Sequence, residues 1–212
     1  MGDGWKKIND IAMAMLKLIY INVLWIAFTL FGLILLGLMP ATAAMFTVIR
    51  KWVQRDRTLM IFQTFRKTYV QEFWKSNALG LFLLIAGGIL YIDFLFIGRQ
   101  EGVVVYLLTP LLYILLVAYI VTMLFLFPVY VTFDHKLYTY IKQSFLIGIT
   151  SPMESFLMLG ATVLFSILIL FIPGLLPLFL GSGIALTYTW LGIRAFNKVE
   201  RRKSQQPEQN YN

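Results

Sequence analysis

Four stretches of the chain are free of charge, or nearly so, over lengths that are sufficient to cross a lipid bilayer. Residues 18–49, 102–133 and 155–193 contain no charged side chain, and residues 76–97 contain only Asp93. A transmembrane helix needs roughly 20 apolar residues to span about 30 Å of hydrocarbon. The stretch 155–193 would make a helix about 58 Å long at 1.5 Å per residue, so it must fold back on itself. The chain is therefore predicted to be an all-α, polytopic membrane protein.

The composition supports this class and excludes others. Of the 212 residues, 59% are hydrophobic and 13% are charged, whereas about a quarter of the residues in soluble domains are charged. The chain has no cysteine, which excludes disulfides, thiolate metal sites and cysteine nucleophiles. In a membrane protein, the net charge of +8 is explained by basic loops that lie against anionic lipid head groups. Membrane lipids are thus expected partners, and nucleic acid is not.

We expect about five transmembrane helices, joined by short amphipathic interfacial helices, in a single helical membrane domain of residues 1–197. The predicted spans are about 18–38, 77–97, 103–128, 155–172 and 177–193. Proline cannot donate the backbone hydrogen bond of a helix interior, so helix breaks are predicted at Pro40, Pro128, Pro173 and Pro177.

Three further segments are predicted outside these spans. Residues 5–17 have the spacing of an amphipathic lead-in helix that lies at the membrane interface. Residues 40–49 are apolar but too short to cross, so they either dip back into the interface or pack on the other helices. Residues 198–212 form a polar tail that is expected to be disordered.

The substantial loop, residues 50–75, is basic. Apolar side chains recur at helical spacing after Thr58, which predicts an interfacial helix with a cationic outer face. Thr58 and Asp134 are expected to cap short helices, and Ser151 with Glu154 is expected to form a capping box. The basic residues of the loop that we expect to face a partner or lipid are Arg50, Lys51, Arg55, Arg57, Arg66 and Lys67.

The distribution of Lys and Arg predicts the orientation in the membrane. With five spans, the 50–75 loop, the loop after the third span and the C-terminal tail share one side, and they hold 14 of the 18 basic residues. The positive-inside rule places that side in the cytoplasm and the N-terminus outside. Lys6, Lys7 and Lys17 oppose this, and a complete hairpin over residues 18–49 would place the N-terminus inside.

Few residues are candidates for a chemical function. An intramembrane ionisable group is by default a functional hypothesis, but Asp93 lies about 6 Å from the end of its span, where it can also reach interfacial water or pair with Arg99. Asn22 and Asn77 are polar residues in or beside spans and are expected to make interhelical hydrogen bonds. His135 is the sole histidine, so no metal site or other cofactor is expected. No catalytic residue is predicted, which favours a protein that is not an enzyme.

Several segments resemble the YesL-like family of uncharacterised bacterial membrane proteins. They are GLMPATAAMFTVIRKW (37–52), EFWKSNALGL (72–81), YID (91–93) and LFPVYVTFD…K…FLIGITSP (126–152). Genes of this family commonly lie beside carbohydrate ABC importers, polysaccharide-degrading enzymes and sensor-kinase systems. The resemblance implies a bacterial plasma-membrane protein with an accessory role in oligosaccharide uptake or sensing, whose partners are importer subunits or a sensor kinase. A small solute permease is the alternative.

Overall fold

All the secondary structure in the described part of the chain is helical. The computed structural model describes residues 2–56, 58–99, 101–172, 174 and 176–204. The helices are α1 (Gly2–Phe31), α2 (Leu35–Val53), α3 (Ile61–Gln71), α4 (Phe73–Ile97), α5 (Val103–Thr132), α6 (Leu137–Thr150), α7 (Pro152–Phe171) and α8 (Leu176–Ser204). The predicted all-α class is confirmed.

Four of the helices are long and apolar enough to cross a membrane. They comprise residues Gly4–Phe31, Phe73–Ile97, Val105–Thr132 and Pro152–Phe171. Many apolar side chains of α4, α5 and α7 are exposed, as expected for helices that contact lipid rather than water. The protein is therefore a multi-pass helical membrane protein. α8, where the fifth span was predicted, is not among the four.

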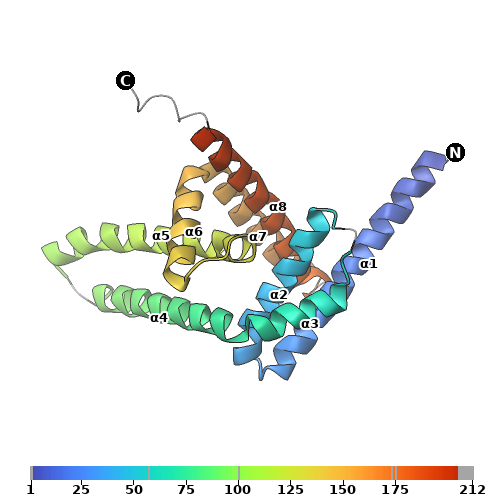
Figure 1. Ribbon diagram of the computed structural model, residues 1–212. Coiled ribbons are helices and arrows are strands. Elements are labelled where there is room, and N and C mark those ends of the chain that lie inside the picture. The colour runs from blue at the N-terminus through green and yellow to red at the C-terminus, as the bar shows by residue number, and fades with distance from the viewer. Residues whose placement is uncertain (1, 57, 100, 173, 175, 205–212) are drawn as a thin grey trace.

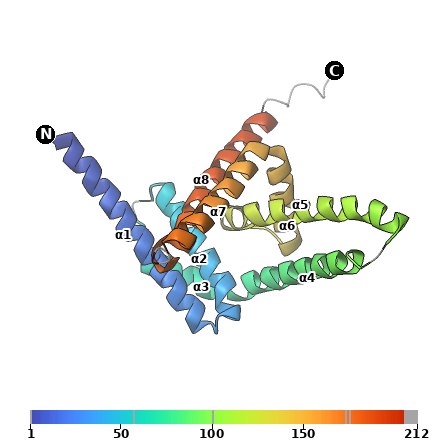
Figure 2. The ribbon, with the colours of Figure 1, turned by 180° about the vertical axis from the view of Figure 1, so that it is seen from behind.

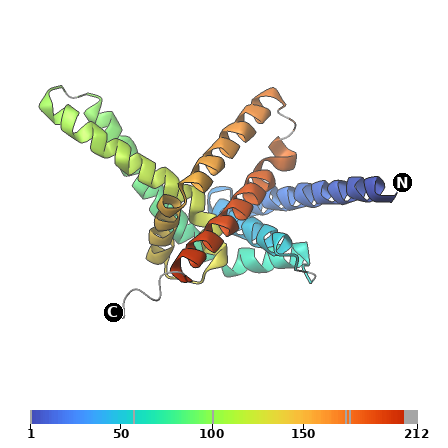
Figure 3. The same cartoon turned by 90° about the horizontal axis from the view of Figure 1, so that it is seen from above.

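The helices extend from a common centre in different directions. α4 and α5 run side by side as a long hairpin (Figures 1 and 2), and its distal end lies far from the other helices. α7 and α8 form a second hairpin, and the N-terminal half of α1 projects separately (Figure 3). We call the region where α2, α3 and α6 meet the inner ends of α4, α5 and α8 the junction.

α2 is the centre of the junction. It contacts α1, α3, α4, α5 and α8, and Ala41, Ala43, Ala44, Val48 and Ile49 on it are fully buried. Alanine side chains let neighbouring helix backbones approach closely, which explains how one short helix accommodates so many neighbours. Residues 40–49, whose placement the sequence left open, thus lie in the packed core of the protein.

The turn between α1 and α2 differs from the predicted break. The helix ends at Phe31 rather than near residue 38, and Leu33 and Ile34 have left-handed backbone angles (φ 58° and 64°). A Cβ on Gly37 would lie 2.4 Å from the Thr29 carbonyl oxygen and 2.9 Å from the Gly32 Cα. The chain therefore reverses here because two glycines let the backbones pass at a distance that no other residue allows.

The predicted breaks at Pro40 and Pro128 are wrong, since α2 runs through Pro40 and α5 runs through Pro128. Proline at position 40 leaves the Leu36 carbonyl without its intrahelical donor. The Asn77 side chain supplies one: its Nδ2 donates to the Leu36 oxygen at 2.9 Å, and also to the Phe73 oxygen at 2.8 Å. In lipid, a proline is tolerated within a helix when a neighbouring helix satisfies the freed carbonyl.

Two other predicted boundaries are corrected. α1 is continuous through Lys17 rather than preceded by a separate lead-in helix, because residues 5–17 contain no glycine or proline and are rich in Ala, Met and Leu. α8 continues to Ser204, so residues 198–204 of the predicted disordered tail are helical, and residues 205–212 lie outside the described residues. Pro177 lies in the first turn of α8, where proline is tolerated, and Pro173 lies outside the described residues.

None of the predicted side-chain caps is present. Thr58 donates its hydroxyl to Asp56 instead of capping α3, and the N-cap residue of α6 is Lys136 rather than Asp134. Ser151 makes no cap hydrogen bond at the start of α7. The predicted amphipathic helix is confirmed as α3, which buries Phe65 and Tyr69 against α1 and α2.

The Pro40–Asn77 arrangement predicts a coupling that can be measured. Asn77→Ala should lower the free energy of unfolding by about 0.5–1.5 kcal/mol, because the Leu36 carbonyl loses its donor. Pro40→Ala restores a backbone N–H to the Leu36 carbonyl, so Asn77→Ala should cost much less in that background. A double-mutant cycle of unfolding in one detergent measures this difference. Equal costs in both backgrounds would show that the two residues are not coupled.

Candidate functional site

Polar side chains from distant parts of the chain meet in the junction. Glu72 lies between α3 and α4, and Lys75 lies in the first turn of α4. Tyr130 comes from the end of α5, Asp134 from the following loop and Tyr140 from α6. The Tyr130 hydroxyl donates to Glu72 Oε2 at 2.5 Å, and Lys75 Nζ donates to Asp134 Oδ1 and to the Tyr140 hydroxyl, each at 3.1 Å. We call these five residues the polar cluster.

Tyr140 is the centre of the polar cluster. Its side chain is 1% exposed, and its hydroxyl accepts from Lys75 and from the His135 backbone N–H at 3.0 Å while it donates to the Phe133 carbonyl at 3.1 Å. Lys75 Nζ also lies 5.1 Å from the Tyr140 ring centroid, within the range of a cation–π interaction. The cluster therefore joins α4 to the loop before α6 by directional contacts.

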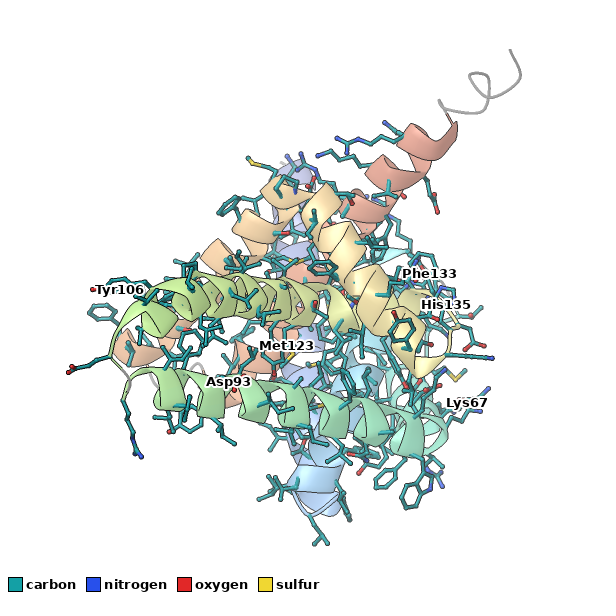
Figure 4. All side chains as sticks on the ribbon, turned by 90° about the vertical axis from the view of Figure 1, so that its left-hand side faces the viewer. Lys67, Asp93, Tyr106, Met123, Phe133 and His135 are labelled. Atoms are coloured by element: carbon teal, nitrogen blue, oxygen red, sulfur yellow. The ribbon has the colours of Figure 1, made fainter. Side chains whose placement is uncertain are left out.

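Sequence reasoning did not identify the tyrosines of the polar cluster. Each lies in an apolar or amphipathic segment where an aromatic residue is ordinary, and their partners are 58 and 65 residues away in the chain. His135, the one residue of this region that was considered for metal binding, stacks on Phe133 with the ring centroids 5.7 Å apart (Figure 4). The described residues contain no group of three His, Cys, Asp or Glu side chains that could hold a metal ion.

The basic residues of the 50–75 loop separate into two groups. Arg50 is structural: its guanidinium donates to the Val131 carbonyl at 2.8 Å, and burial lowers its pKa. Lys51 is half-buried at the end of α2, Arg55 is exposed in the turn that follows, and Arg57 lies outside the described residues.

The second group lies on α3 and faces outward. Arg66 and Lys67 are exposed, and with Phe62 and Val70 they line a shallow hollow of about 460 Å³. Phe62 is 47% exposed and Val70 is 65% exposed. The outward face of α3 thus combines positive charge with exposed apolar side chains.

The intramembrane polar residues have separate surroundings. Asn22 is fully buried, and its Oδ1 accepts the backbone N–H of Ser182 at 3.1 Å, which joins α1 to α8. Asn77 joins α4 to α2, as described above. Asp93 is half-buried on the side of α4 that faces α5 (Figure 4). The ion pairs formed by described residues do not include the expected Asp93–Arg99 pair.

Glu154, which the sequence assigned to a capping box, is a buried carboxylate instead. Its side chain is 2% exposed, and its oxygens lie 3.8 Å from Arg194 Nε and 3.5 Å from Lys198 Nζ. Both cations belong to α8, so these ion pairs join the start of α7 to the end of α8. The signal in the sequence was a lone acid at the start of an apolar span and basic residues at the end of the next.

Comparison with known proteins gives relatives over almost the whole chain. The profile of a family described as a protein of unknown function, DUF624, matches residues 18–94. The uncharacterized protein YesL of Bacillus subtilis is 34% identical over 202 residues, which cover 94% of each protein. The uncharacterized protein YteU of the same organism is 34% identical over 189 residues, 88% of this chain and 83% of YteU. No solved structure shows significant similarity.

The polar cluster predicts different roles for two tyrosines. Tyr130→Phe removes the donor to the Glu72 carboxylate and should lower the free energy of unfolding by about 1.5–3 kcal/mol, the range for hydrogen bonds to charged groups. Tyr138→Phe is the matched control, because Tyr138 is 74% exposed on α6 and its change should stay within about 0.5 kcal/mol. Unfolding in the same detergent measures both, and equal losses would contradict a structural role for the cluster.

Proposed function

The chain belongs to the YesL-like family of DUF624 proteins, and on that premise we propose that it is a non-enzymatic accessory protein of the bacterial plasma membrane. It works with an oligosaccharide ABC importer or with the sensor kinase that responds to the same sugar. The gene neighbourhoods implied by the family resemblance suggest these partners. We propose that it binds its partner through the outward face of α3, where exposed cations lie beside exposed apolar side chains.

The outward face of α3 has the properties of a recognition surface. Its inner face is occupied, since Phe65 and Tyr69 pack against Phe28 of α1 with ring centroids 5.1 and 5.0 Å away. Arg66 and Lys67 on the outer face can attract an acidic partner, and Phe62 and Val70 supply apolar area beside them. Charges at the rim steer association and apolar anchors hold the partner in place.

We further propose five spans, α1, α4, α5, α7 and α8, with the junction in the cytoplasm. Contacts link the three basic segments: Arg50 reaches Val131, Lys75 reaches Asp134, and Phe133 packs on Phe196 with ring centroids 5.3 Å apart. Segments that contact one another in this way belong on the same side of the membrane, and their positive charge favours the cytoplasmic side. The side of the N-terminus separates this proposal from the alternative in which α1 and α2 form a hairpin. Lys17 Nζ lies 5.7 Å from the Trp52 ring, a contact that the hairpin explains directly because it returns the N-terminus to the junction side.

The alternative function is a small solute permease. Pro40, Pro110 and Pro128 lie inside helices, as in the broken helices of transporters, and Asp93 faces α5. The carbonyl freed by Pro40 is bonded to Asn77, however, which favours a packing role for that proline. Sugar flux into proteoliposomes of the purified protein, lost on Asp93→Asn, would favour the permease.

The absence of cysteine from the chain allows a direct test of orientation. A membrane-impermeant maleimide should label Gly98→Cys in intact cells and Gln54→Cys only after permeabilisation. Gln54 follows α2, and Gly98 lies at the distal end of the α4–α5 hairpin, so the proposal places them on opposite sides of the membrane. Gly4→Cys distinguishes the two arrangements of α1: it is labelled in intact cells with five spans and only after permeabilisation if α1 and α2 form a hairpin. Labelling of Gln54→Cys in intact cells would reverse the proposed orientation.

The docking surface is tested by charge reversal. Arg66→Glu with Lys67→Glu should reduce the recovery of importer or kinase subunits with the tagged protein from native membranes by about tenfold or more, since like charges at an interface cost several kcal/mol. Lys6→Glu with Lys7→Glu makes the same charge change at the exposed start of α1 and should have no effect. A photo-cross-linker at Gln63 should capture the same subunit.

The recovery and cross-linking experiments with the otherwise wild-type protein decide whether α3 is a docking surface. Recovery of no importer or kinase subunit, together with cross-links from Gln63 to lipid only, would show that α3 is an interfacial helix and not a docking surface.

A further inference from the structure

A cationic cavity lies where the start of α7 meets the end of α8. Its volume is about 660 Å³, and the side chains that carry the argument are Glu154 of α7 and Trp190, Arg194, Lys198, Arg201 and Arg202 of α8. We propose that this cavity binds the phosphate head group of an anionic phospholipid. The proposal is independent of a partner protein on α3.

The lining residues form one stripe along α8. Positions 190, 194, 198 and 202 are each four residues apart and position 201 is three residues from 198, so these side chains lie along one side of the helix. Trp190 is 55% exposed and lies at the apolar end of the stripe, and the four cations follow toward Ser204. Arg194 lies with its guanidinium carbon 5.9 Å from the Trp190 ring centroid. Tryptophan followed by basic residues is the order found where a helix leaves the hydrocarbon for the cytoplasmic head groups.

The charge in the cavity is strongly unbalanced. Four cations line it against one carboxylate, and that carboxylate is buried and engaged with Arg194 and Lys198. Like charges one turn apart on a helix repel each other. The ion pairs with Glu154 orient Arg194 and Lys198, and a phosphate bound beside them would reduce the repulsion along the stripe. Arginine and lysine are the side chains that recognise phosphate oxygens, arginine by two parallel hydrogen bonds.

The surroundings favour a lipid over a soluble anion. The first turns of α7 expose Met153 (59%), Phe156 (72%) and Leu157 (41%), and α7 is one of the helices suited to cross the membrane. Acyl chains can lie along this apolar surface while the head group reaches the cations of α8. Basic pockets at the cytoplasmic ends of transmembrane helices bind anionic head groups in this way. A soluble phosphate or an acidic peptide would leave the apolar surface unused.

The test measures lipid binding to the purified full chain in detergent. Addition of cardiolipin or phosphatidylglycerol should raise the melting temperature, and native mass spectrometry should detect retained anionic lipid, whereas phosphatidylcholine and inorganic phosphate should give neither effect. Arg201→Gln with Arg202→Gln should weaken the lipid affinity by about tenfold or more. This pair is chosen because Arg194 and Lys198, which form the ion pairs with Glu154, are retained. Arg202 also donates to the Thr150 carbonyl at 3.3 Å, so the melting temperature of the lipid-free variant is compared with that of the wild type.

Matched variants keep the outcome decisive. Arg66→Gln with Lys67→Gln removes the same charge from α3 and should retain full lipid affinity, and Arg201→Lys with Arg202→Lys should retain most of it. The proposal is overturned if the α3 variant loses as much affinity as the α8 variant, or if phosphatidylcholine or inorganic phosphate stabilises the protein equally. Failure of these tests leaves the docking experiment on α3 unaffected, since that experiment reads out a partner subunit and not a lipid.

Discussion

The packing of α2 among five other helices is the constraint on which the rest of the structure depends. A helix in this position must be narrow, and the alanines at 41, 43 and 44 make it so. It must also be closely joined to α1, which the two glycines of the turn achieve. Its proline at position 40 leaves the Leu36 carbonyl without an intrahelical donor, and the Asn77 side chain of α4 supplies one. Pro40 and Asn77 lie in PATAA and FWKSN, two of the segments that carry the resemblance to the family.

The charge-free runs were sufficient to predict the long helices. α4, α5 and α7 begin or end within a few residues of the predicted spans, because an apolar run of about 20 residues has few alternatives in a membrane. The boundaries at Pro40 and Pro128 were wrong because the effect of a proline depends on what lies beside it. The α1–α2 turn was missed for the same reason. Position 32 must be glycine because Gly37 and the Tyr69 hydroxyl leave no space for a side chain there, and that crowding exists only in the folded protein.

The roles of three buried polar residues could not be predicted from the sequence. Tyr130, Tyr140 and Glu154 were each assigned no role or a local one, because a local partner was the simplest hypothesis. Each instead bonds to a residue from another part of the chain, Glu72, Lys75 or Lys198. By contrast, the cationic residues on the outward face of α3 could be predicted, since the two faces of an amphipathic helix are encoded in one continuous segment. The exposure of Phe62 and Val70 beside them was not predicted.

The distribution of contacts follows from the solvent. Apolar side chains gain little by leaving lipid for another helix, so association in a membrane depends on close packing of small residues and on hydrogen bonds between helices. In this protein the junction holds the alanines of α2, Asn77 and the polar cluster. Two further contacts lie outside it: Asn22 joins α1 to α8, and the Glu154 ion pairs join α7 to α8. The distal half of the α4–α5 hairpin has few such groups, and it extends away from the other helices (Figure 1). The outward face of α3 thus lies on the most closely packed part of the protein, which is the arrangement that the proposed docking role requires.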